Sequence, residues 1–292
     1  MQLTFKTILT TIRFHHYVKN LFIFLPLFFG SQLLNFPLLS KTTLAFVAFS
    51  FTASAIYILN DFKDIDVDKH HPYKKYRPIP LGIISTEHAQ FLMTIFLLVG
   101  LGLMLSLSIS AFIVLICYII LNIGYSFYFK HIFILDITII AIGFVLRIIV
   151  GSFVSTISLS TWIILMTFLL AFFIALSKRR DDLLFFLKTK SKIRKVIDRY
   201  DLKIIDKSLM LMAFVIIFIY VLYTIAANET LAANNNYIFL TILFVIIGFF
   251  RYFQIVFTDH HSGSPTTIFY RDKILKLTIL IWVLFYTWII YL

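Results

Sequence analysis

Four aspartates within eight residues form the stretch of this sequence with the clearest potential for chemistry. Asp61, Asp64, Asp66 and Asp68 lie in "NDFKDIDVDKHHPYKKYRPIP", which opens on Asn60. If a helix runs through this stretch, Asn60, Asp64 and Asp68 are four residues apart and share one face. Asp61 lies beside that face, whereas Asp66 points elsewhere. Like charges at this spacing repel, and oxygen ligands suit a hard cation, so Asn60, Asp61, Asp64 and Asp68 are predicted to bind Mg²⁺.

Cationic side chains accompany the aspartates and are suited to binding phosphate. They are Lys63, Lys69, Lys74, Lys75 and Arg77. An acidic cluster for a metal beside a basic cluster for phosphate is typical of a site for a metal-bound diphosphate. The alternative, a solvated loop in which the charges neutralise one another, is disfavoured by the regular spacing of the aspartates.

A second charged cluster follows a later apolar run. The stretch "SKRRDDL" places Lys178 and Arg179 just ahead of Asp181 and Asp182. It again combines phosphate-binding side chains with carboxylates at the end of a predicted helix.

Two further charges enter a predicted membrane helix in "YSFYFKHIFILDITIIAIGFVLRIIVG". Asp136 and Arg147 are eleven residues apart, about three helical turns, and Gly143 lies on the same face. A charge at that depth is costly unless it is paired or lines a polar cavity. The two residues therefore face inward, either as part of a cavity lining or as a structural ion pair. Lys130 precedes them in a short turn.

The elements that position these residues are apolar helices. Of the 292 residues, 61% are hydrophobic and 14% charged, which excludes a soluble domain and predicts an all-α polytopic membrane protein. The apolar runs predict nine helices, near Leu21–Leu39, Thr42–Leu59, His88–Leu107, Ala111–Phe127, Ile132–Phe153, Thr161–Ser177, Ser208–Ala227, Tyr237–Phe257 and Ile274–Tyr291.

The positive charges predict the orientation of these helices. Of 26 Lys and Arg residues, 23 fall in the N-terminal arm, in alternate loops or at the start of the ninth helix. By the positive-inside rule these segments, the N-terminus and the charged clusters face the cytoplasm. Cations scattered over several loops at one bilayer surface also argue against a nucleic-acid partner.

The largest loops follow the second and sixth helices, which suggests a duplicated fold. We expect one domain over residues 1–292, with four-helix units at about 17–127 and 132–257 and a ninth helix at 274–291.

Several of these stretches resemble one known family. "NDFKDIDVD" followed by "KKYRPIPLG" resembles the first aspartate motif of the UbiA superfamily of intramembrane prenyltransferases. The segments "YVKN", "GFVLRIIVG", "SKRRDDL", "FRYFQIV" and "GSPTTIFYRDK" are most similar to its branch of polyprenyl-phosphate phosphoribosyltransferases. The resemblance covers nearly the whole chain. Family members often carry Glu at the position of Asp182.

The resemblance implies Mg²⁺-dependent transfer of 5-phosphoribosyl from 5-phosphoribosyl-1-diphosphate to a decaprenyl-like polyprenyl phosphate in the cytoplasmic membrane. Asp61, Asp64 and Asp68 would be catalytic. The implied substrate-binding residues are Asn60, Lys19, Lys74, Lys75, Arg77, Tyr125, Lys130, Asp136, Arg147, Lys178, Arg179 and Asp182. Partners would be these substrates and membrane lipids, and the sequence is compatible with an oligomer.

Two alternatives stay open. One is a prenyltransferase that moves a polyprenyl diphosphate onto an aromatic acceptor, although "KRRDD" is a poor copy of the second aspartate-rich motif such enzymes carry. The other is a transporter or scaffold without chemistry. Transporters also place charge between repeats, but rarely concentrate four aspartates outside the bilayer core.

Overall fold

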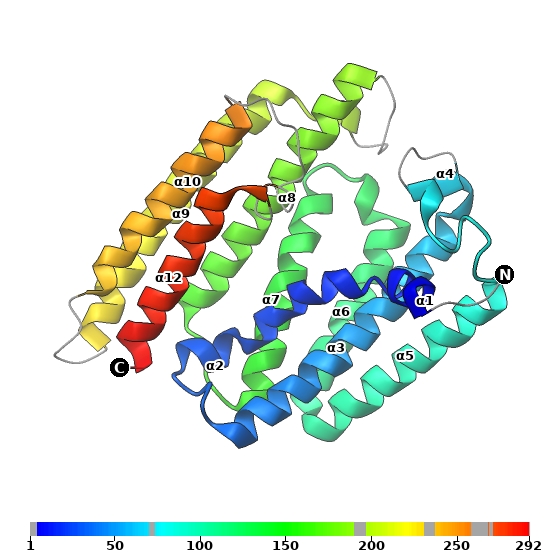
Figure 1. Cartoon of the computed structure of the whole chain (residues 1–292), viewed down its shortest axis with the longest axis horizontal. Coiled ribbons are helices and arrows are strands. Elements are labelled where there is room, and N and C mark those ends of the chain that lie inside the picture. Colours follow the sequence, from blue (N-terminus) through cyan, green and yellow to red (C-terminus); the bar gives the residue numbers. More distant parts are fainter. Residues whose placement is uncertain are drawn as a thin grey trace. The chain divides into compact units, whose positions relative to one another are not determined.

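The chain is helical and divides into two compact units (Figure 1). The structure, a computed structural model, describes residues 5–69, 74–189, 197–230, 237–257, 268 and 271–291. Unit 1 comprises residues 1–130 and 142–159, and unit 2 comprises residues 131–141 and 160–292. The assignment of both units to a single domain remains a prediction.

In the described part of the chain, eight helices are long and apolar enough to cross a membrane. They are α3 (Phe36–Lys63), α5 (Thr86–Leu107), α6 (Ile109–Phe127), α7 (Leu135–Ser155), α8 (Thr161–Thr189), α9 (Leu202–Thr230), α10 (Thr241–Phe257) and α12 (Lys273–Tyr291). The membrane span of α9 ends at Ala227, and that of α10 includes the 3-10 helix η5 (Ile238–Leu240) before it. The prediction of an all-α polytopic membrane protein is confirmed. Orientation relative to the cytoplasm remains a prediction.

The first predicted helix, Leu21–Leu39, is wrong as a single element. This region contains the 3-10 helix η1 (Phe14–Phe24), which follows α1 (Phe5–Thr11), and the short α2 (Leu25–Phe29). Helix α2 ends at Phe29 with Gly30 as its C-cap, and Ser31 takes a positive φ of 55°. The side chain of Asn35 then caps the start of α3 by accepting a hydrogen bond from the Leu38 amide. Hydropathy does not detect this turn, because the residues on both sides of it are apolar.

In unit 1, the long helix α3 packs against α5, α6 and η1. Figure 1 shows α3 and α5 running side by side. Their contact is close because α5 has a glycine at position 100, where a Cβ would lie 2.5 Å from Thr52 Oγ1 and 2.7 Å from the Ala48 carbonyl oxygen. Small residues on both helices therefore set their separation.

The aspartate-rich stretch begins inside α3 and continues past its end. Helix α3 ends at Lys63, Asp64 caps it, and α4 (Ile65–Lys69) follows at once. The amide of Asp64 still donates to the Asn60 carbonyl (3.1 Å), and the amide of Asp68 donates to the Asp64 carbonyl (2.7 Å). The predicted helical spacing therefore holds, with a local break at Asp64.

In unit 2, α8 packs against α9, and α10 packs against both α9 and α12. Their buried aromatic and aliphatic side chains form one core. Polar groups add directional contacts, because Tyr220 donates to Thr241 Oγ1 (2.8 Å) and accepts from Trp282 Nε1 (2.9 Å). The last helix is thereby tied to α9.

Candidate active site

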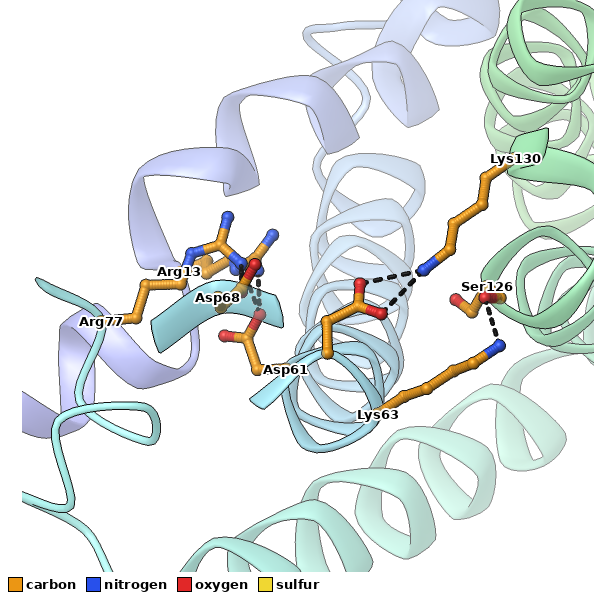
Figure 2. A network of polar contacts seen from close by, with 8 residues as sticks. Arg13, Asp61, Lys63, Asp68, Arg77, Ser126 and Lys130 are labelled. Atoms are coloured by element: carbon orange, nitrogen blue, oxygen red, sulfur yellow. Dashed lines mark hydrogen bonds and ion pairs between the residues drawn. The ribbon is translucent and has the colours of Figure 1, made fainter. Parts of the chain in front are cut away.

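Two of the predicted aspartates lie in the interior of unit 1 around one arginine (Figure 2). Asp61 and Asp68 are 3% and 0% exposed. Arg77 Nη1 donates to Asp61 Oδ1 and to Asp68 Oδ2, each at 2.8 Å. Because buried carboxylates need compensating charge, this guanidinium holds the end of α3, α4 and the segment at Arg77 together.

A second arginine reaches the same carboxylate. Arg13 Nη2 donates to Asp61 Oδ1, and the guanidinium carbon of Arg13 lies 4.9 Å from the ring centroid of Tyr57. Arg13 precedes η1 in a left-handed conformation (φ 52°). Both arginines therefore donate to the same carboxylate oxygen of Asp61.

The third aspartate points toward a different partner. Lys130 Nζ donates to both carboxylate oxygens of Asp64, at 2.8 and 2.9 Å. The neighbouring Lys63 Nζ donates to the Ser126 carbonyl (2.6 Å) and lies 3.7 Å from the ring centroid of Phe127. Figure 2 shows both lysines spanning from the end of α3 to the end of α6 and the turn after it.

The donor set fits a divalent cation at two of the predicted ligands. Asp61 and Asp68 already share one cationic nitrogen, so a cation held by oxygen ligands can bridge the same pair. Asp64 faces Lys130 instead. No group of three carboxylate, histidine or cysteine side chains converges on one point in the part of the chain that the structure describes. Asp66 points elsewhere, as predicted, because its side chain is 94% exposed and contacts Lys69 at 3.4 Å.

Arg147, in the unit 1 part of α7, is buried among neutral groups. It donates to Asn20 Oδ1 (2.8 Å), the Gly143 carbonyl (2.7 Å) and Tyr118 Oη (3.1 Å). Its guanidinium carbon also lies 4.9 to 5.3 Å from the ring centroids of Phe49, Tyr118 and Phe144. These contacts are cation–π interactions.

Asp136, in the unit 2 part of the same helix, has a different arginine partner. Arg179 Nε donates to Asp136 Oδ2 (2.5 Å), Arg179 Nη1 to Asp182 Oδ2 (2.8 Å), and Tyr200 Oη to Asp136 Oδ1 (2.7 Å). Burial and the hydrogen bond to Asp136 raise the pKa of Tyr200. The ion pair of Asp136 with Arg147, one of the two expected arrangements, is therefore wrong. Eleven residues of helix separate them by about 16 Å along its axis.

The chain matches the model of the UbiA prenyltransferase family over residues 21–270. The chain belongs to this family. It is a transferase embedded in the membrane.

Named relatives of this UbiA-family chain are similar over most of its length. It is 29% identical to decaprenyl-phosphate phosphoribosyltransferase of Corynebacterium glutamicum over 276 residues, which cover 93% of this chain and 83% of the relative. It is 30% identical to the enzyme of the same name from Mycolicibacterium smegmatis, covering 84% of this chain and 78% of the relative. A solved UbiA homologue from Archaeoglobus fulgidus, bound to DMAPP and Mg²⁺, has a TM-score of 0.71 at 18% identity, covering 97% and 98% of the two chains. The latter likeness concerns the fold.

The remaining predicted residues of the UbiA-family chain are more dispersed. Lys75 is exposed beside the Tyr76 ring, and Lys178 is exposed on α8. Asn60 and Tyr125 are half-buried. The side chain of Lys74 lies outside the described residues.

Lys19 is half-buried on η1. Burial, followed by the charges of Arg147 and Arg13, lowers the pKa of Lys19 from 10.5 to about 8.

Arg13 is a site residue that the sequence pattern did not indicate. It stands outside the aspartate stretch, and its charge was read only as part of a positive N-terminal arm. Spacing gave no signal for it, because Arg13 precedes η1 in a left-handed conformation and contacts an aspartate 48 residues away in the sequence.

Proposed function

We propose that this chain transfers 5-phosphoribosyl from 5-phosphoribosyl-1-diphosphate to a polyprenyl phosphate in the cytoplasmic membrane, with its site toward the cytoplasm. The oxygen of the lipid phosphate attacks C1 of the ribose, and the bond from C1 to the diphosphate oxygen breaks. The diphosphate leaves with the electron pair. Because the attacking phosphate is already an anion at neutral pH, the step requires no strong general base.

The contrast between the two acidic clusters carries this proposal. In unit 1 the aspartates are surrounded by cations from four segments of chain, at Arg13, Lys63, Arg77 and Lys130. In unit 2, Asp136 and Asp182 are both bound to Arg179, which is 0% exposed. An acidic cluster with this many cations around it suits a phosphate-rich substrate pair. Similarity to decaprenyl-phosphate phosphoribosyltransferases over 93% of the chain supports the same reading.

The roles of the residues follow from charge and placement. Asp61 and Asp68 would hold Mg²⁺, with Asp64 and Asn60 as further oxygen ligands. When bound, Mg²⁺ would neutralise charge that develops on the departing diphosphate. Arg77 and Arg13 would bind phosphate oxygens, because their planar guanidinium groups suit such contacts. Lys130, Lys75 and Lys74 would add positive charge for the donor.

The alternative, prenyl transfer from a polyprenyl diphosphate to an aromatic acceptor, has one observation in its favour. Solved homologues of the same fold are bound to the prenyl diphosphates DMAPP and GPP with Mg²⁺, at 18% and 20% identity. Asp136 and Asp182 are bound to Arg179 much as Asp61 and Asp68 are bound to Arg77, so ion pairing alone does not separate the two reactions. The stretch "KRRDD" disfavours the alternative, because it is a poor copy of the second aspartate-rich motif that such prenyltransferases carry.

Isotope labels in the donor test the proposal. Purified protein in detergent, with Mg²⁺ and polyprenyl monophosphate, receives donor labelled with ³²P in its 5-phosphate or in its β-phosphate. We expect the 5-phosphate label in the lipid extract and the β label in released diphosphate. EDTA should stop both the transfer to lipid and the release of diphosphate. The protein is first checked for folding and purity. If both labels then stay in the aqueous donor, the proposed reaction is rejected.

A further inference from the structure

The 3-10 helix η1 presents three faces with different surroundings. Residues three apart in such a helix eclipse one another. One face is bonded to α3, because Asn20 Nδ2 donates to Ser50 Oγ (2.8 Å) and Tyr17 Oη lies 3.0 Å from Ser54 Oγ. Another face is exposed at Val18. The helix is thereby fixed to α3 on one side and open on another.

Lys19 lies on the third face, between α3 and α7. One turn before it, the ring of His16 lies 5.1 Å from that of Tyr57 on α3. One turn after it, the ring of Phe22 lies 4.9 Å from that of Phe144 on α7. The backbone of Lys19 is fixed by the hydrogen bonds of Asn20 next to it, so its side chain extends from a held position.

Positive charge dominates around this lysine. Arg13 and Arg147 are near enough that their charges contribute to the lowered pKa of Lys19. Arg13 is paired with Asp61, whereas Arg147 donates to an amide, a carbonyl and a hydroxyl. Among the described residues, neither Lys19 nor Arg147 is hydrogen-bonded to a carboxylate. Buried cations without an anionic partner are costly, and an anionic ligand removes that cost.

We propose that Lys19, backed by the fixed charge of Arg147, binds a phosphate monoester group of a substrate at a subsite of unit 1 distinct from the aspartate cluster. This assignment rests on the proposed function and states which group binds there. Lys19 contacts the phosphate, and Arg147 is a positioning residue that orients Asn20 and supplies positive potential.

Two substrate groups have this chemistry. One is the phosphate of the polyprenyl acceptor, and the other is the 5-phosphate of the donor. Both are monoesters, unlike the diphosphate that the aspartate cluster would take with its metal. Substrate pairs that differ only in the monoester distinguish the two sources.

Equilibrium binding to purified protein, without turnover, tests the subsite directly. The acceptor pair is polyprenyl monophosphate and the matching polyprenol, and the donor pair is 5-phosphoribosyl-1-diphosphate and ribose 1-diphosphate. The variants are Lys19→Gln and Lys19→Arg, with Lys41→Gln as the control because Lys41 is an exposed lysine of the same unit. All variants are first checked for unchanged thermal stability.

We expect Lys19→Gln to weaken binding of one phosphorylated ligand by about 10- to 100-fold, the range for a hydrogen bond to a charged group. Binding of its partner without the monoester should change less than about twofold. Lys19→Arg should restore most of the affinity, and Lys41→Gln should leave it unchanged. The affected pair identifies the acceptor or the donor as the source.

Equal affinity of wild type and Lys19→Gln for all four ligands would overturn the subsite. An equal loss for phosphorylated and unphosphorylated partners would also overturn it, because it would indicate a packing role. Since these measurements need no reaction, a protein that fails to transfer phosphoribose but shows the monoester-specific loss would reject the proposed function and retain the subsite.

Discussion

Asp66 and Asp68 are two residues apart in sequence and have opposite environments. The Asp68 side chain is 0% exposed and bound to Arg77, whereas that of Asp66 is 94% exposed. We expect Asp68→Asn to lower the transfer rate at saturating Mg²⁺ by at least about 100-fold, because an amide cannot supply the charge that holds a metal. Asp66→Asn is the matched control and should stay within about twofold of wild type. Equal rates for both variants would contradict the metal assignment.

The sequence predicted which aspartates differ but not what they bind. Helical spacing correctly placed Asp66 away from the others, because the backbone hydrogen bonds continue through Asp64 and into α4. It wrongly grouped Asp64 with Asp68, because the break at Asp64 turns that side chain to Lys130. Asp61 and Asp68 pair with Arg77, whereas Asp64 pairs with Lys130. The ion pair of Asp64 joins segments that are far apart in sequence. Periodicity contains no information on such contacts.

Lys19 gives the site a specific pH dependence. The pKa of Lys19 is lowered to about 8 by burial and by Arg147 and Arg13, with His16 on the same face of η1 and Tyr57 opposite it. Above that pH the free protein loses the charge that would bind phosphate. We expect kcat/KM for the substrate whose monoester binds there to fall as pH rises through about 8.

In Lys19→Arg this inflection should be absent, because the arginine stays charged. An unchanged inflection in that variant would assign the titration to another group. Folding shows the opposite trend. Since the folded pKa lies below the unfolded value of 10.5, the free energy of unfolding should rise with pH between about 8 and 10.5.

The buried cluster at Arg179 predicts a large effect on stability. Asp136→Leu leaves the guanidinium of Arg179 in the interior with Asp182 as its remaining acidic partner. We expect a loss of about 3–5 kcal/mol, with partial recovery in the double variant Asp136→Leu/Arg179→Leu. Asp66→Leu, which removes the partner of Lys69 in an exposed ion pair, should cost less than about 1 kcal/mol. Denaturant unfolding in detergent measures all three, and no recovery in the double variant would contradict a structural ion pair.

At the scale of elements, the contact of α3 with α5 depends on one glycine. A Cβ at position 100 would lie 2.5 Å from Thr52 Oγ1 and 2.7 Å from the Ala48 carbonyl, whereas a Cβ at Gly102 would meet nothing within 4 Å. We expect Gly100→Ala to cost about 1–3 kcal/mol through overpacking. Gly102→Ala should be neutral or stabilising, because alanine favours a helix. The midpoint of thermal unfolding in detergent compares them, and equal midpoints would contradict this account of the contact.

Hydropathy located eight of the nine predicted helices because each contains a long uninterrupted apolar run. It failed at Leu21–Leu39, where Gly30 and the positive φ of Ser31 turn the chain without a change in polarity. It also placed the end of the second helix at Leu59, although α3 continues to Lys63. The interior of unit 1 accepts those last polar residues because Asp61 is paired with two arginines.

Across the whole chain, the two units differ in how their charged groups are paired. Unit 1 holds aspartates with several cationic partners, and unit 2 holds carboxylates bound to Arg179. The sequence showed a similar mixture of charges in both loops and could not separate these roles, because pairing requires the fold. We therefore propose that the active site lies in unit 1, where the cations suit phosphate-rich substrates.

A competition assay tests this claim most directly. Purified protein in detergent with Mg²⁺ receives four substrates together: polyprenyl monophosphate, 5-phosphoribosyl-1-diphosphate, polyprenyl diphosphate and 4-hydroxybenzoate. Mass spectrometry of the lipid extract identifies the product. We expect 5-phosphoribose linked through C1 to the polyprenyl phosphate as the product, with its formation lost in Asp68→Asn and retained in Asp66→Asn. A prenylated aromatic product, with no phosphoribosyl lipid, would contradict the account and leave only the family and the fold standing.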